Sequence, residues 1–227
     1  MEKLTELYNK WHGSMPESAV RLAGAGSNRQ YYRFTAEDGT TVIGVVGTSR
    51  DENHAFVYLA QHFEQRQLPP QVLAVSDDGL RYLQTDLGSV SLFDAVRGGR
   101  EAGGRYNLEE QELLKRTIRQ LPNIQIRGAR GLDWQNCYPQ PEFDEDSVLF
   151  DLNYFKYCFL KPSGLDFHEL KLEANFRLMA KDLTSEQVDS FLYRDFQARN
   201  VMLDAEGNPY FIDFQGGRKG PYYYDLA

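Results

Sequence analysis

The spacing of apolar residues predicts a helix at the start of the chain. Residues 2–12 place Leu4, Leu7, Tyr8 and Trp11 on one face of such a helix. Charged residues fill the other positions of the segment. We therefore expect a short amphipathic helix before the first strand.

Short apolar runs after this helix predict two hairpins. A strand over 30–36 and the run TVIGVV at 41–46 flank the turn EDGT, whose Asp-Gly pair is typical of hairpins. Residues 50–66 have apolar positions at helical spacing, and 71–87 read as a second strand, Asp-Gly turn and strand. The first ninety residues are therefore expected to be strand-rich, with one helix inserted after the first hairpin.

Helical patterns dominate after the second hairpin. The segment 107–121 opens with Asn followed three residues later by Glu, which is a capping-box pattern. Residues 147–161 and 166–183 are two further predicted helices. Between the second hairpin and these helices, the glycine-rich segment 97–105 is expected to be an exposed loop between lobes, or else an interdomain linker.

The order of these elements predicts an α+β fold with two lobes. Residues 1–90 form the strand-rich lobe, and residues 91–227 form the helical lobe. Near its end the helical lobe carries a further hairpin with polar residues at both ends. The final letters DLA read as the start of another helix, so we expect the natural chain to continue past residue 227.

The composition excludes several classes of protein. With 227 residues, of which 41% are hydrophobic, the chain can bury a core and is not mostly disordered. A formal net charge of −8 argues against a general nucleic-acid binder or a binder of acidic membranes. No apolar run approaches the roughly 20 residues of a membrane helix. The charged start differs from a secretory signal.

Cysteine and histidine content narrows the compartment and the chemistry. Cys137 and Cys158 are too few and too isolated for a disulfide framework, so we expect an intracellular, cytoplasmic protein. The four histidines lie far apart and show no zinc spacing with cysteine. Any metal site is therefore expected to use oxygen ligands.

Three polar residues near the end of the chain predict phosphoryl transfer. Asp195 is followed five positions later by Asn200, and Asp213 comes thirteen positions after that. The hairpin between Asn200 and Asp213 returns its ends to within roughly 5–10 Å of each other. Their hard oxygens would then suit Mg²⁺. Asp195 precedes the hairpin and can act as the base that deprotonates a hydroxyl.

The strings YRDFQARN and IDFQ resemble the protein-kinase pair H-R-D-x-x-x-x-N and D-F-G. The closer resemblance is to the aminoglycoside phosphotransferase and choline kinase superfamily, small-molecule kinases of the same fold. It runs from GAGSNRQYYRF to GPYYYDLA and is strong over residues 191–227 but weak before about residue 90. Within that superfamily the chain most resembles the anomeric amino-sugar kinases, which phosphorylate N-acetylmuramate and N-acetylglucosamine.

This resemblance implies a protein-kinase-like fold that binds ATP between its two lobes, with residues 1–90 as the nucleotide-binding lobe. It implies that Asp195 is the catalytic base and that Asn200 and Asp213 are the Mg²⁺ ligands. It also implies a structural role for Asp225, which would cap the next helix and brace the catalytic loop.

The sequence departs from the kinase pattern at three places. Tyr193 stands where the usual histidine would be, and Gln215 replaces the flexible glycine of D-F-G. The phosphate-binding lysine is missing from the strand TVIGVVG, since no lysine lies between Lys10 and Lys115. Glu52 remains as the candidate for the glutamate on the inserted helix.

An arginine is expected to replace the missing lysine, because a triphosphate needs cationic neighbours. Arg33 is the first choice, since it lies within a strand whose alternate side chains face the cleft. Arg29 is the second choice, beside the glycine turn. That turn, with Gly24, Gly26 and Ser27, is expected to offer backbone N–H groups to the phosphates.

These features predict an enzyme that moves the γ-phosphoryl group of ATP to a hydroxyl of a small molecule, with a sugar or amino sugar favoured. We expect no nucleic-acid or membrane partner. The alternative is a non-catalytic nucleotide-sensing module that regulates a fused or partner domain. The missing lysine favours this alternative, whereas the intact Asp195, Asn200 and Asp213 disfavour it. A protein kinase comes third, because only QGGRKGP separates IDF from YYYDLA.

Overall fold

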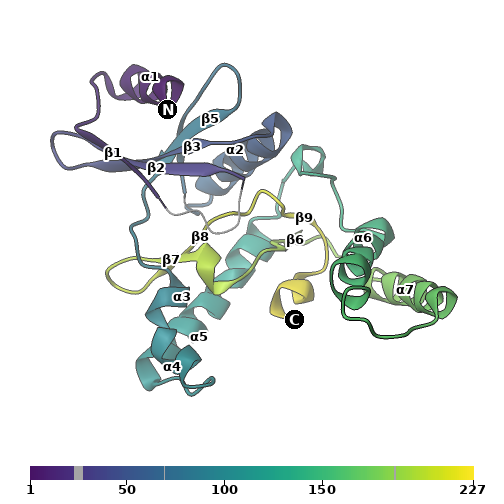
Figure 1. The fold of residues 1–227 in the computed structure, drawn as a ribbon. Helices are drawn as coiled ribbons and strands as arrows, with labels where there is room; N and C mark the ends of the chain where they lie inside the picture. Colours follow the sequence, from purple (N-terminus) through teal and green to yellow (C-terminus); the bar gives the residue numbers. More distant parts are fainter. Residues whose placement is uncertain (23–27, 69, 187) are drawn as a thin grey trace.

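The structure is a computed structural model that describes residues 1–22, 28–68, 70–186 and 188–227. A strand-rich part and a helical part follow one another along the chain (Figure 1). Both parts contain the secondary structure that the sequence predicts for an α+β fold.

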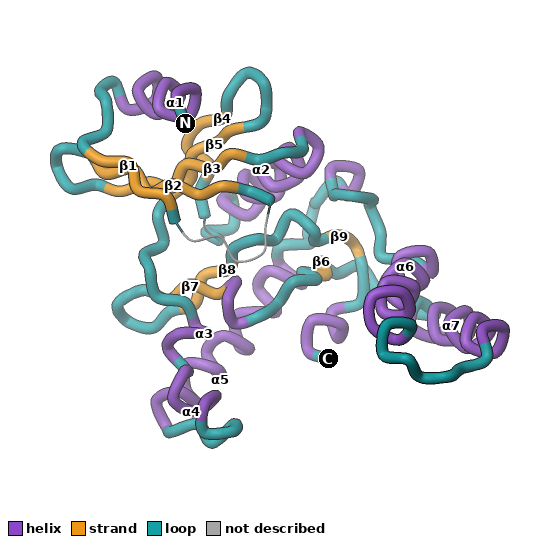
Figure 2. The backbone as a smooth tube through the Cα atoms, in the orientation of Figure 1, coloured by secondary structure: helices purple, strands orange, loops and turns teal. Residues whose placement is uncertain are grey.

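A five-stranded antiparallel sheet forms the first part of the chain (Figure 2). The strands lie in the order β1-β2-β3-β5-β4. Their bounds are Ser18–Arg21 (β1), Gln30–Thr35 (β2), Thr41–Val46 (β3), Val72–Val75 (β4) and Arg81–Thr85 (β5). The β2–β3 and β4–β5 hairpins confirm the predicted pairs, whereas the sequence analysis did not identify β1.

Asp-Gly turns close both predicted hairpins. Gly39 and Gly79 have φ angles of 84° and 67°, a region in which residues with a Cβ are strained. In each turn the preceding aspartate, Asp38 or Asp78, accepts the backbone N–H two positions further on. Local turn chemistry therefore fixes the register of these strands.

Seven α-helices lie within the described residues, and two π-helical segments continue α5 and α6 (Figure 1). The helices are Glu2–His12 (α1), Arg50–Glu64 (α2), Leu92–Ala95 (α3), Arg97–Glu101 (α4), Leu108–Pro122 (α5), Glu145–Phe155 (α6) and Glu169–Leu183 (α7). The π-helical segments are Asn123–Arg127 and Lys156–Leu160. Four short strands complete the second part: Phe191–Leu192 (β6), Val201–Leu203 (β7), Pro209–Phe211 (β8) and Arg218–Lys219 (β9).

Helices α1 and α2 cover opposite faces of the sheet. Successive residues of a strand point to opposite faces. Val42 and Leu83 belong to the apolar cluster under α1, whereas their neighbours Ile43 and Tyr82 belong to the cluster that includes residues of α2. The central strands are therefore buried on both faces.

The expectation that the glycine-rich segment 97–105 is an exposed loop is wrong, because this segment contains the helix α4. Gly99 is buried, and its N–H donates to Oε1 of Glu110 at 2.8 Å. Glu110 also completes the capping box with Asn107 at the start of α5. This shared carboxylate anchors α4 to α5, a contact that composition alone does not indicate.

One apolar core joins the sheet to the second part of the chain. Phe56 stacks on Phe214 at 5.1 Å between ring centroids. Phe63 meets Phe191 and Phe214 edge to face at 5.1 and 5.2 Å. Helix α2 therefore packs directly against the segments that carry the candidate catalytic residues.

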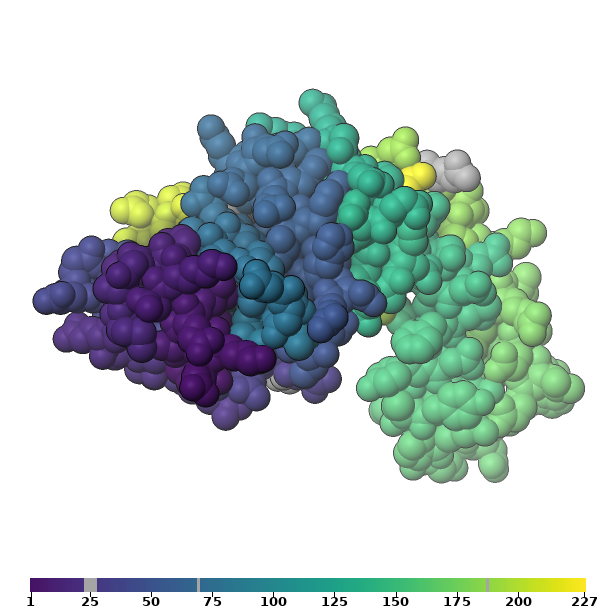
Figure 3. Space-filling view, turned by 90° about the horizontal axis from the view of Figure 1, so that it is seen from above, coloured from purple at the N-terminus to yellow at the C-terminus, as the bar shows by residue number. Residues whose placement is uncertain are grey.

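Helices α6 and α7 pack on each other and stand apart from the main body (Figure 3). These two helices expose several large apolar side chains, including Phe150, Tyr154 and Leu178. Among the described residues, no helix is both long and apolar enough to cross a membrane.

We expect Phe63→Ala to lower the free energy of unfolding by about 3–5 kcal/mol, because a fully buried aromatic side chain leaves a cavity. Phe150→Ala is the matched control, since Phe150 is 69% exposed and should change stability by only about 0.5 kcal/mol. Urea unfolding followed by circular dichroism measures both variants. Equal stability of the two would show that Phe63 does not hold the core together.

Candidate active site

A cleft of about 350 Å³ lies between the sheet and the hairpin β7–β8. Residues of β2, β3 and β5 line one side, and Asn200, Met202, Ile212 and Asp213 line the other. The connection that leaves β5, residues 85–89, also borders the cleft. The resemblance implies a nucleotide between two lobes, and this cleft is the candidate for that site.

The hairpin β7–β8 brings Asn200 and Asp213 to the same side of this cleft. The N–H of Ile212 donates to the carbonyl of Asn200 at 3.0 Å, so the residue before Asp213 pairs with Asn200. The hydroxyl of Tyr193 donates to the carbonyl of Ile212 and lies 3.4 Å from that of Asn200. The hydroxyl of Tyr193 thus contacts the backbone at both ends of the hairpin.

Two hard oxygens remain available at these positions. The Nδ2 of Asn200 donates to the carbonyl of Asp195 at 2.9 Å, and Oδ1 of Asn200 makes no hydrogen bond with the described residues. Oδ1 of Asp213 accepts from Nε2 of Gln215 at 2.9 Å, and Oδ2 of Asp213 is likewise not hydrogen-bonded there. An amide and a carboxylate oxygen of this kind fit Mg²⁺, which completes its shell with waters and phosphate oxygens.

Protein ligands alone do not form a metal cage here. Within the described residues, no group of three or more His, Cys, Asp or Glu side chains is placed to hold a metal ion. A cation bound by Asn200 and Asp213 would therefore depend on ligands from water or a bound phosphate.

The backbone of the catalytic segment is strained at two positions and held by a buried carboxylate. Arg194 and Asp213 have φ angles of 74° and 65°, a region that costs a residue with a Cβ roughly 1–2 kcal/mol. Asp225 accepts the N–H of Tyr193 at 2.9 Å and that of Arg194 at 2.8 Å. Nε2 of Gln125 donates to the same carboxylate at 2.7 Å. Asp225 thus braces the catalytic loop, as the resemblance implied.

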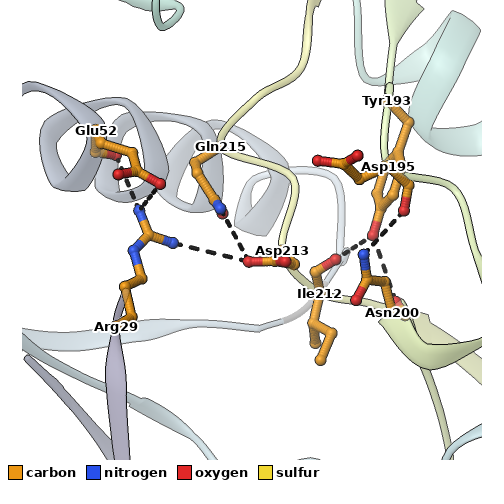
Figure 4. A network of polar contacts seen from close by, with 8 residues as sticks. All are labelled: Arg29, Glu52, Tyr193, Asp195, Asn200, Ile212, Asp213 and Gln215. Atoms are coloured by element: carbon orange, nitrogen blue, oxygen red, sulfur yellow. Dashed lines mark hydrogen bonds and ion pairs between the residues drawn. The ribbon is translucent and has the colours of Figure 1, made fainter. Parts of the chain in front are cut away.

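A buried arginine joins the sheet side of the cleft to Asp213 (Figure 4). Arg29 is 4% exposed, and its Nη2 lies 3.2 Å from Oε1 of Glu52 on α2. Its Nη1 lies 3.9 Å from Oδ1 of Asp213. Arg29 therefore holds the ion pair with the helix glutamate that a lysine holds in protein kinases.

Arg33 lines the same cleft but contacts different partners. Its guanidinium is paired with Asp86, at 2.5 Å from Nε and 3.0 Å from Nη2, and also donates to the carbonyl of Gly88. Asp86 accepts the N–H of Gly88 as well, so it also caps the turn that follows β5. Arg33 thus lies at the connection to the second part of the chain, and Arg29 lies near Asp213.

A second pocket, of about 510 Å³, adjoins the first and contains Asp195. Asp213 lines the first pocket, Gln215 lines the second, and the two side chains are hydrogen-bonded (Figure 4). Glu52 borders the second pocket too. Partial removal of water and the charge of Asp213 raise the pKa of Asp195 above its ordinary value. The carboxylate of Asp195 therefore lies near that of Asp213, one of the two oxygen-bearing residues of the hairpin.

The predicted site residues fall into three groups. Asp195, Asn200, Asp213, Arg29 and Glu52 come together around the two pockets, and Arg33 lies farther along the first pocket. Gly24, Gly26 and Ser27 lie outside the described residues. Arg218 of β9 also lines the second pocket. It is not predicted from the sequence, because a charged residue near a strand end has no distinguishing pattern.

Residues 18–227 match the model of a family described as the phosphotransferase enzyme family. The chain belongs to this family. The match covers nearly the whole chain, from β1 to the last residue. It therefore includes both pockets and every predicted site residue of this phosphotransferase family member.

Solved structures show the same kinase-like fold. The ternary complex of streptomycin, ATP and APH(2")-IIa aligns with a TM-score of 0.65 at 14% identity, covering 99% of this chain and 73% of that one. The choline kinase LicA from Streptococcus pneumoniae gives 0.65 at 14%, with 100% and 72% covered. Macrolide 2'-phosphotransferase MphH from Brachybacterium faecium gives 0.59 at 10%, with 100% and 76% covered. A comparison with curated protein sequences gives no match.

We expect Asp225→Asn to lower the free energy of unfolding by about 1.5–3 kcal/mol, the usual worth of hydrogen bonds to a charged group. The new amide N–H₂ would face backbone N–H donors of the catalytic loop. Asp166→Asn is the control, because Asp166 is exposed. Chemical unfolding compares the two variants. If both match the original protein, Asp225 does not hold the loop.

Proposed function

We propose that this phosphotransferase moves the γ-phosphoryl group of ATP to a hydroxyl of a small molecule. The observation that carries the proposal is the placement of Asp195 in one pocket beside Asn200, Asp213 and Arg29, which border the other. Relatives named for streptomycin, choline and a macrolide support a small-molecule acceptor. The resemblance to the amino-sugar kinases favours a sugar or amino sugar.

In this proposal ATP occupies the first cleft, between a nucleotide-binding lobe of residues 1–90 and a catalytic lobe of residues 91–227. The adenine end lies toward the connection 85–89, and the phosphates lie toward Asn200 and Asp213. A relative solved with ATP and another solved with AMP support the use of this nucleotide.

Asn200 and Asp213 would hold Mg²⁺ through Oδ1 of Asn200 and Oδ2 of Asp213, which make no hydrogen bond with the described residues. The ion would neutralise negative charge on the phosphates during transfer. Gln215 and the carbonyl of Asp195 fix the orientation of these two side chains through the hydrogen bonds described above.

Asp195 acts as the base in the proposed reaction. Its carboxylate takes the proton of the acceptor hydroxyl, and the hydroxyl oxygen forms a bond to the γ-phosphorus. The bond from that phosphorus to the β,γ-bridging oxygen breaks, and ADP leaves with the electron pair. Asp195 lines the second pocket, so this pocket is the acceptor site in the proposal.

Arg29 is the cation that we assign to the triphosphate, ahead of Arg33. Its contacts with Glu52 and Asp213 support this order. The guanidinium of Arg33 is already paired with Asp86 and donates to the carbonyl of Gly88, at the other end of the cleft. The sequence ranked these two arginines the other way round.

The nucleotide-sensing alternative loses its main support under this assignment. The missing lysine favoured it, but Arg29 and Glu52 form the corresponding ion pair. We also keep the cytoplasm as the proposed location, supported by Cys137 and Cys158, both of which are free thiols.

We expect Asp195→Asn to lower turnover by roughly 10²–10⁴, the usual contribution of a general base, with ATP binding nearly unchanged. Asp213→Asn should instead weaken binding of ATP·Mg²⁺, by at least the roughly 10–100-fold that loss of a supporting metal contact costs. ADP release with an acceptor panel gives turnover, and calorimetric titration gives affinity. Unchanged turnover of Asp195→Asn would remove Asp195 from the mechanism.

We expect Arg29→Ala to weaken ATP·Mg²⁺ binding about ten- to a hundred-fold, because a charge-assisted contact to phosphate is lost. Arg33→Ala is the matched control and should change affinity by less than about threefold, since its side chain is held by Asp86. Calorimetry on folded variants measures both. A larger loss for Arg33→Ala would restore the order that the sequence suggested.

A further inference from the structure

The second pocket contains a buried arginine that the proposed phosphoryl transfer does not use. Arg218, in β9, is 4% exposed and lines this pocket together with Asp195. Its Nε donates to the carbonyl of Gly216 at 3.2 Å. In the part of the chain that the structure describes, no carboxylate oxygen lies within 4.0 Å of its guanidinium. A buried cation without an anion is costly.

The charged side chain beside Arg218 increases this cost. Nη2 of Arg194 forms an ion pair with Oδ1 of Asp151 at 2.7 Å. The carboxylate of Asp151 is therefore paired with Arg194 and not with Arg218. Burial, followed by the positive charge of Arg194, lowers the pKa of Arg218 to about 10, and the more distant carboxylates of Asp151 and Asp144 oppose only part of this shift. An anion that entered the pocket would therefore be stabilised at Arg218.

Arg218 is also close to the expected base. A Cβ placed on Gly216 would lie 3.7 Å from Oδ2 of Asp195, and the carbonyl of Gly216 accepts the hydrogen bond from Arg218. Gly216 thus lies next to both side chains. A molecule bound at Arg218 would occupy the pocket into which Asp195 opens.

Gln215 gives a second, independent sign of a ligand in this pocket. It is 8% exposed, and its Nε2 is used by Asp213 (Figure 4). Its Oε1 is buried and accepts no hydrogen bond from the described residues. Buried acceptors are almost always paired, so this oxygen is expected to accept a donor from a bound molecule.

We propose that the acceptor carries an anionic group, a carboxylate or a phosphate, which binds the guanidinium of Arg218, and a hydroxyl or amide N–H that donates to Gln215. Acidic sugars are the substrate class that combines these groups with a phosphorylatable hydroxyl. A planar guanidinium matches both anions with paired hydrogen bonds. The inference rests on the proposed function, since it takes the second pocket as the acceptor site.

Three carboxylates also line the pocket, and none of them neutralises Arg218. Glu52 is paired with Arg29 at 3.2 Å. Asp146 is exposed, and Asp195 is the expected base. The anion site is therefore local to Arg218, and the pocket as a whole is not a cationic one.

The first test compares matched acceptors on the unmodified protein with a non-hydrolysable ATP analogue and Mg²⁺. Each acid is paired with its neutral parent: D-glucuronate or glucose 6-phosphate with D-glucose, and N-acetylmuramate with N-acetylglucosamine. Calorimetry should show at least one acid binding about ten- to a hundred-fold more tightly than its parent. The carboxylate and phosphate pairs separate the two kinds of anion, and choline serves as a cationic probe that should not bind.

The second test uses variants that are first shown to be folded by thermal unfolding. Arg218→Gln should reduce the ratio of acid to neutral affinity toward one, whereas Arg218→Lys should keep part of it. Arg177→Gln is the matched control, because Arg177 is exposed on α7, and its ratio should stay unchanged. The comparison on the unmodified protein holds even if Arg218→Gln fails to fold.

The outcomes separate this inference from the proposed function. No acid binding more tightly than its parent, or an acid preference that survives in Arg218→Gln, would overturn the anion site. Acid binding without ADP release, with ATP in place of the analogue, would contradict the phosphotransferase function and support the anion site. ADP release at equal rates for acids and parents would support the phosphotransferase function and contradict the anion site.

Discussion

Two carboxylates balance the almost completely buried guanidinium of Arg29, and these contacts link three separate segments of the chain. Arg29 precedes β2, Glu52 lies in the first turn of α2, and Asp213 follows β8. A charge withdrawn from water without partners would be strongly destabilising. The sheet, the inserted helix and the catalytic hairpin are therefore held in one arrangement by the same cation that faces the cleft.

Aromatic packing between α2 and the segment after β8 stabilises the same arrangement of these three segments. Phe56 of α2 stacks on Phe214, which directly follows Asp213, and Phe63 of α2 meets the same ring edge to face. Asp225 and Tyr193 hold the neighbouring catalytic loop in a strained conformation from the other side. Strain at Asp213 persists because buried contacts on both sides determine its backbone, which is common at functional sites.

Local patterns in the sequence carried much of the fold. Alternation and Asp-Gly turns predicted both hairpins of the sheet, and apolar spacing with a capping box predicted α2 and α5. The helix α4 was not predicted, because its hydrogen bond to Glu110 joins it to α5, and the local sequence of 97–105 does not indicate this contact. Strand β1 was not predicted, because all four of its residues are exposed and they show no alternation of apolar and polar positions.

Long-range pairing limited the prediction of the site. The spacing of Asp195, Asn200 and Asp213 was readable because one hairpin connects them. The choice between Arg29 and Arg33 was not, since it depends on Glu52 and on Asp86, which lies 53 residues from Arg33. Arg218 could not be predicted from the sequence, because only the structure shows that no carboxylate among the described residues pairs with it.

The central claim is that the cleft holds a divalent cation together with the phosphates of ATP. Mn²⁺ accepts the same oxygen ligands as Mg²⁺ and has an electron paramagnetic resonance signal that weakens on binding to protein. Titration of the protein into Mn²⁺ with ATP measures this directly. The account predicts that the signal of free Mn²⁺·ATP falls as protein is added, and that protein without ATP has little effect. A signal that stays unchanged with ATP present would contradict it.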